Sequence, residues 1–116
     1  MPASSKATMN MVENTISSQK NCSSVTSDGG NQGYYLKGDK ETLFIDFSNE
    51  SIDISNKGNH LKSYDVSKSK DMKEAMNDAY DIIKDIKATL KDIDSKSLGI
   101  EAKQEVKQES RGMELD

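Results

Sequence analysis

Seven apolar residues in the second half of the chain recur at alternating intervals of four and three, and no other feature constrains the fold as strongly. They are Met72, Met76, Ala79, Ile83, Ile86, Leu90 and Ile93. Because an α-helix has 3.6 residues per turn, this spacing places all seven on one side of a helix. Asp71 and Glu74 have the spacing of a capping box, and Gly99 is typical of a helix end. We therefore expect one long amphipathic helix between about residues 69 and 98.

Four short segments that precede this helix alternate apolar and polar residues, which is the pattern of half-buried strands. They are Tyr34–Lys37, Thr42–Phe47, Ser51–Ser55 and Leu61–Val66. Gly38 with Asp39, and the polar run over residues 56–59, are turn signals between them. The sequence thus predicts a four-stranded antiparallel meander with Leu43, Ile45, Phe47, Ile52, Ile54, Tyr64 and Val66 on its inner face.

The two ends of the chain lack this apolar periodicity. Residues 1–32 are rich in serine, and only Met9, Val12 and Ile16 have helical spacing, so too little surface is buried there to offset the entropy of ordering. We expect a disordered N-terminal arm over 1–32, an α+β domain of order ββββα over 33–98 and a charged flexible tail over 99–116.

Charge and apolar content argue against several classes of partner. The chain has 16 basic and 20 acidic side chains, so it offers no overall positive field for nucleic acid or an anionic membrane. Its apolar runs, such as Leu43–Ile45, are far shorter than a membrane span or the core of a signal peptide. We expect a cytoplasmic protein that binds neither nucleic acid nor membrane directly.

The residue types that catalysis requires are sparse. The one histidine, His60, follows a turn signal and has no Cys, Asp or Glu at ligand spacing beside it. The one cysteine, Cys22, lies in a serine-rich stretch without neighbouring bases. The sequence therefore predicts no enzyme activity, no metal and no cofactor.

Two pairs of side chains are candidates for a protein-binding surface. Tyr35 and Phe44 are expected as cross-strand neighbours on the outer face of the sheet. Tyr80 and Ile82 flank the apolar stripe of the helix. The stripe itself either covers the sheet or forms a coiled-coil seam with a second copy, since oligomerisation would stabilise so small a core.

The predicted helix also carries an acidic ridge, which we define as Asp71, Glu74, Asp78, Asp81, Asp85 and Asp92. A solvated charged face opposite the apolar stripe is the ordinary interpretation, because lysines of the same segment compensate these charges. The alternative is a ridge that docks on a basic partner by imitating DNA phosphates.

These features together indicate a non-catalytic protein–protein interaction module that self-associates into a homo-oligomer. Disordered ends around a small domain would suit a viral or phage accessory protein. Two alternatives stay open: a structural component whose N-terminal arm orders against neighbouring subunits in an assembly, and an acidic inhibitor of a nucleic-acid-binding protein.

Overall fold

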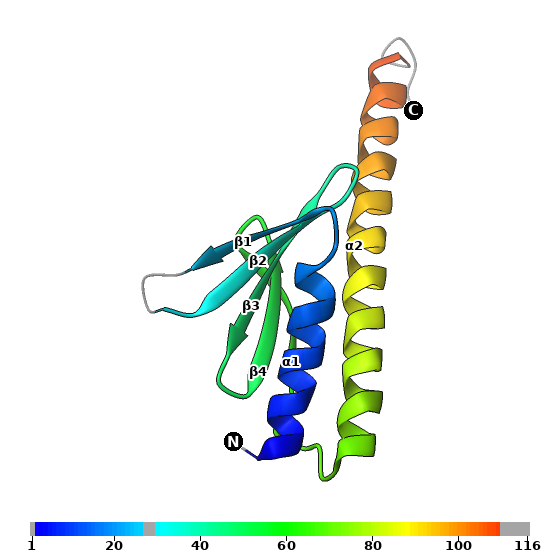
Figure 1. The fold of residues 1–116 in the computed structure, drawn as a ribbon. Helices are drawn as coiled ribbons and strands as arrows, with labels where there is room; N and C mark the ends of the chain where they lie inside the picture. The colour runs from blue at the N-terminus through cyan, green and yellow to red at the C-terminus, as the bar shows by residue number, and fades with distance from the viewer. Residues whose placement is uncertain (1, 27–29, 110–116) are drawn as a thin grey trace.

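The computed structural model of the protein describes residues 2–26 and 30–109. In chain order its elements are α1 (Ala3–Ser17), β1 (Cys22–Thr26), β2 (Gln32–Lys37), β3 (Thr42–Ser48), β4 (Ser51–Asn56), β5 (Asn59–Asp65) and α2 (Met72–Glu109). The five strands form one antiparallel sheet in the order of the chain. Figure 1 shows the two helices side by side on one face of this sheet, both running in the same direction.

The four predicted strands and their antiparallel order are confirmed as β2 to β5. The predicted inner face is also confirmed: Ile45 pairs with Ile54 across β3 and β4, and both side chains are fully buried. Lys57 and Gly58, with φ of 53° and 81°, form the two-residue connection from β4 to β5. Positive φ at both positions is what a hairpin of the type I′ class requires.

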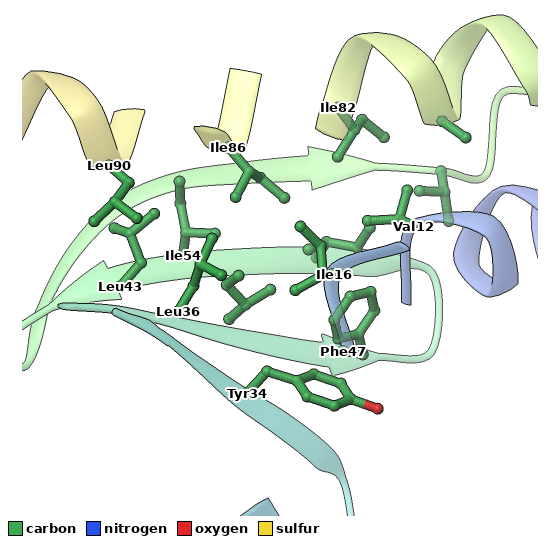
Figure 2. Close-up of a cluster of buried hydrophobic side chains, with 14 residues drawn as sticks. Val12, Ile16, Tyr34, Leu36, Leu43, Phe47, Ile54, Ile82, Ile86 and Leu90 are labelled. Carbon is green, nitrogen blue, oxygen red and sulfur yellow. The ribbon is translucent and has the colours of Figure 1, made fainter. Parts of the chain in front are cut away.

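The core lies between the inner face of the sheet and the two helices (Figure 2). Alternation along β3 and β4 directs every second side chain toward the helices, which is why these strands are buried on one face only. The largest side chains that are completely covered are Ile16, Leu43, Ile45, Ile52, Ile54 and Ile86.

The prediction of a disordered arm over residues 1–32 is wrong for α1 and β1. Val12 and Ile16 of α1 have no exposed surface, and β1 adds a fifth strand, in which Val25 pairs with Gly33. Helix α1 escapes prediction because its buried side is largely polar. Ser4 Oγ donates a hydrogen bond of 2.6 Å to the carbonyl of Ser69, and Thr8 Oγ1 donates one of 3.3 Å to the carbonyl of Ala75. Tertiary contacts of this kind stabilise a helix that would be marginal alone.

Helix α2 differs from the prediction in its end and in its buried side. It continues beyond Gly99 to Glu109, so the first part of the expected tail is helical, while residues 110–116 of that tail lie outside the described residues. Of the predicted seven, Ala79, Ile86 and Leu90 are buried, and Ile83 and Ile93 pack partly buried against the core, but Met72 and Met76 are exposed. Ala75 and Ile82, which are outside the predicted seven, are buried as well.

Candidate functional site

Three exposed apolar side chains follow one another along α2, and we call them the α2 strip: Met72, Met76 and Tyr80. Their exposed fractions are 56, 60 and 64%. Spaced four residues apart, they share one side of the helix and extend over roughly 12 Å at 1.5 Å per residue. Lys84 places its Nζ 6.0 Å from the centre of the Tyr80 ring. The sequence predicted Tyr80 at a surface, but it placed both methionines on the apolar stripe that would cover the sheet or form a seam with a second copy.

Ile82, the other predicted contact residue of the helix, belongs to the core instead. It is only 8% exposed and packs in the cluster that α1 and the sheet form with α2. Ile82 and Met76 lie on different sides of α2: the side with Ile82 faces the core, and the side with Met76 faces solvent. Apolar spacing identifies a helical face, but it cannot determine which of two adjacent apolar rows the neighbouring elements cover.

The outer face of the sheet carries the predicted aromatic pair, Tyr35 and Phe44, which we call the sheet patch. These residues pair directly across β2 and β3, and their ring centres are 5.1 Å apart at an angle of 48°. Phe44 is half-buried because its ring lies over Gly33, where a Cβ would come within 2.8 Å of Phe44 Cζ. Tyr35 remains exposed, so the pair does form a surface feature.

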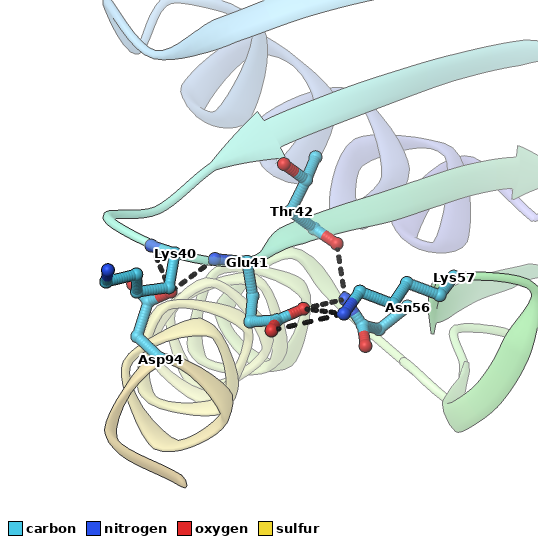
Figure 3. Close-up of polar contacts among 6 residues, drawn as sticks. All are labelled: Lys40, Glu41, Thr42, Asn56, Lys57 and Asp94. Carbon is cyan, nitrogen blue, oxygen red and sulfur yellow. Dashed lines mark hydrogen bonds and ion pairs between the residues drawn. The ribbon is translucent and has the colours of Figure 1, made fainter. Parts of the chain in front are cut away.

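A shallow hollow of about 500 Å³ adjoins the sheet patch and includes Glu41 and Lys57 in its lining. Figure 3 shows the Glu41 carboxylate directed at Asn56 and Lys57, with Asn56 Nδ2 3.1 Å and Lys57 Nζ 3.3 Å from it. Hydrogen bonds from Ser97, Asn56 and Lys57 hold the pKa of Glu41 below its usual value. The Glu41 carboxylate therefore links the start of β3 to α2 and to the turn after β4.

Asp94 of α2 fastens the turn between β2 and β3 (Figure 3). Its carboxylate accepts hydrogen bonds from the backbone N–H groups of Asp39, Lys40 and Glu41 at 2.9, 3.0 and 2.7 Å. The approach is close, since a Cβ at Gly38 would lie 2.8 Å from Asp94 Cγ. Burial opposes ionisation of this carboxyl, but the three backbone donors outweigh it and lower the Asp94 pKa.

We expect Asp94→Ala to lower the free energy of unfolding by about 1–3 kcal/mol at neutral pH, the usual effect of losing hydrogen bonds to a charged group. Because the folded pKa is lowered, this stabilisation is present above the unfolded pKa of about 4 and disappears as the pH falls through the folded pKa. Urea unfolding at several pH values measures both effects. The control is Asp92→Ala, which removes only the exposed ion pair with Lys96 and should change little. Equal effects of the two variants would contradict the assignment.

Most members of the acidic ridge are engaged within the chain. Asp85 accepts hydrogen bonds from Tyr64 and from Lys62, whose Nζ is 3.0 Å away, and these two donors lower its pKa. Asp78 Oδ2 accepts a hydrogen bond of 2.6 Å from Ser69 Oγ. Asp71 accepts the N–H of Glu74 at 2.8 Å, the predicted N-terminal cap. The ridge therefore holds α2 against β5 and the preceding turn.

His60 lies near two groups that suggest hydrolytic chemistry, Ser63 and Asp53. The His60 Nε2 atom is 2.8 Å from Ser63 Oγ, while the Ser63 hydroxyl donates a hydrogen bond to the Asp53 carboxylate. A catalytic triad needs the histidine between the serine and the carboxylate, so that it can accept the serine proton. Here the serine occupies the middle, and the cluster is largely exposed on the outer face of the sheet. This arrangement does not activate Ser63.

Within residues 2–26 and 30–109, no three His, Cys, Asp or Glu side chains are arranged to hold a metal ion. Neither of the two helices, over the part that the structure describes, is long and apolar enough to cross a membrane. No protein-family model, curated protein or solved structure matches the chain.

Proposed function

We propose that this chain is a non-catalytic protein-binding module whose main contact surface is the α2 strip. The observation that carries the proposal is the exposure of three large apolar side chains on successive turns of one helix. Isolated exposed apolar residues are common on folded proteins, but a contiguous row of them is typical of an interaction site.

The chemistry of the strip fits this role. Methionine side chains are flexible and polarisable, so they adapt to the surface of a partner. Tyrosine combines a large apolar ring with a hydroxyl that can stay hydrated, and it is enriched in protein interfaces. Met72, Met76 and Tyr80 are also dispensable for the core, because the buried row of α2 from Ala75 to Leu90 already covers the sheet and α1.

The two alternatives have less support. An arm that orders against neighbouring subunits would have to be free, but α1 buries Val12 and Ile16 in the core of its own chain. An acidic inhibitor would need its charges available, yet Asp78 and Asp85 are paired with Ser69, Lys62 and Tyr64. The sheet patch remains the second candidate surface for a protein partner.

The test compares Met76→Glu with Asn77→Glu, an equal change of charge at the adjacent exposed residue. Both variants should fold, because neither side chain is in the core. We expect Met76→Glu to lose the proteins that the wild type retains in affinity capture from its source cells. Asn77→Glu should keep them.

The same affinity capture with the Tyr35→Ser variant tests the sheet patch. Loss of the captured proteins with Tyr35→Ser, and their retention with Met76→Glu, would assign binding to the sheet patch and contradict the proposal.

A further inference from the structure

We infer that the α2 strip binds an amphipathic helix of a partner protein, and that this helix carries acidic residues beside its apolar side chains. This inference rests on the proposed function and adds the chemistry of the partner. It is carried by the lysines that border the strip and by the hydrogen bonds that hold Asp78, Asp85 and Glu13 away from it.

Three lysines, Lys73, Lys84 and Lys87, border the strip, and we call them the lysine flank. Lys73 is three residues before Met76 and Lys84 is four residues after Tyr80, so helical spacing makes both neighbours of the strip. Lys87, three residues after Lys84, extends the same side of the helix by one turn. All three are exposed. In the described part of the chain none of them forms an ion pair, and Lys84 lies over the Tyr80 ring.

Most acidic side chains that the structure describes on the helices are engaged away from this flank; Asp81, which is exposed three residues before Lys84, is the exception. Asp78 and Asp85 point to the β5 side of α2, where they bind Ser69, Lys62 and Tyr64. The only acidic side chain of α1, Glu13, accepts a hydrogen bond of 2.6 Å from Tyr34 of β2. The border of the strip therefore carries more positive than negative charge, although the chain as a whole has a net charge of -4.

The shape of the strip fits a helical partner. Its side chains, four residues apart, form one ridge inclined to the axis of α2, and such a ridge packs into the groove between ridges of a second helix. Carboxylates on the borders of that helix would lie opposite the lysine flank, where complementary charge speeds association and selects the partner. A second copy of this chain would bring another lysine flank to the strip, so the inferred occupant is a different segment with acidic borders.

The experiment uses the full chain and two synthetic helical peptides of about 18 residues, or five turns. Both carry the same leucine row, but one has glutamate and the other lysine on its borders. We expect the glutamate peptide to bind about tenfold more tightly than the lysine peptide, measured by fluorescence anisotropy, with the difference reduced by salt. Vesicles that mix neutral and anionic phospholipids serve as the third probe.

Matched variants separate the contributions of charge and apolar contact. Lys84→Glu with Lys87→Glu should weaken the glutamate peptide about tenfold, whereas the equal charge change Lys20→Glu with Lys37→Glu, at exposed positions outside α2, should leave it unchanged. The neutral pair Met76→Ser with Tyr80→Ser should abolish binding of this peptide.

The contrary results distinguish failure of the inferred partner from failure of the proposed function. Equal binding of the two peptides, both lost with Met76→Ser and Tyr80→Ser, would refute the acidic partner and leave the proposed function standing. Binding of anionic vesicles without binding of the glutamate peptide would assign the lysine flank to a membrane surface. Failure of every probe would refute the inferred partner, while affinity capture with Met76→Glu still decides the proposed function.

Discussion

Replacement of Ile86 by aspartate is expected to unfold the domain. Ile86 has no exposed surface and lies at the centre of the contact between α2 and the sheet (Figure 2). A carboxylate at this position has no partner, and its burial costs several kcal/mol, whereas a small domain is stable by only about 5–15 kcal/mol. Circular dichroism during thermal unfolding should show no cooperative transition, or one at much lower temperature.

The control for Ile86→Asp is Asp81→Asn, a change at an exposed position of the same helix. It should leave the midpoint of unfolding nearly unchanged, as surface substitutions usually do. A wild-type midpoint for Ile86→Asp would show that this side of α2 does not form the core.

The second large effect is expected at α1. Truncation of the fully buried Ile16 to alanine should lower the free energy of unfolding by about 2–5 kcal/mol, through lost burial and the cavity that it leaves. Asn14→Ala, at an exposed position two residues away, is the matched control and should have little effect. Urea unfolding followed by circular dichroism measures both. If Ile16→Ala were no more destabilising than Asn14→Ala, α1 would not belong to the core.

The sheet could be predicted well because its signals are local. Alternation in Thr42–Phe47 and Ser51–Ser55 determines which side chains face inward, and the turn residues determine where each hairpin reverses. The same register predicts Tyr35 opposite Phe44, and the structure confirms that pairing. Strand β1 was missed because its sequence, Cys22–Thr26, is polar, and its pairing depends on the presence of β2 beside it.

Helix α1 could not be predicted because the first half of its buried side is polar and contacts the rest of the chain through hydrogen bonds. Ser4, Ser5 and Thr8 are buried, and such residues favour caps and turns over helix interiors. Ser4 and Thr8 donate hydrogen bonds to the carbonyl groups of Ser69 and Ala75, two residues that follow all five strands in the sequence. Only Met9, Val12 and Ile16 indicated the buried side, and all three pack in or against the core.

Only part of the candidate site could be predicted, because the burial of α2 also depends on contacts with a distant segment of the chain. Apolar residues occupy two adjacent rows of α2, one with Met76 and Tyr80 and one with Ile82 and Ile86. Periodicity detects both rows together. Because α1 was not expected to cover α2, the sequence could not show that the row with Ile82 is buried and that Met72 and Met76 are left at the surface.

The order of the strands has a consequence for the route by which the chain folds. Each strand pairs with its neighbour in sequence, and β3, β4 and β5 are joined by only the two-residue connections 49–50 and 57–58, so the entropy lost in closing each loop is small. The hydrogen bonds from α1 to Ser69, just before α2, and to Ala75 in its first turn join residues 61 to 67 positions apart. Local pairings of the first kind form quickly, whereas distant ones must wait until the chain between them is compact. The meander thus brings together the two helices that complete its core.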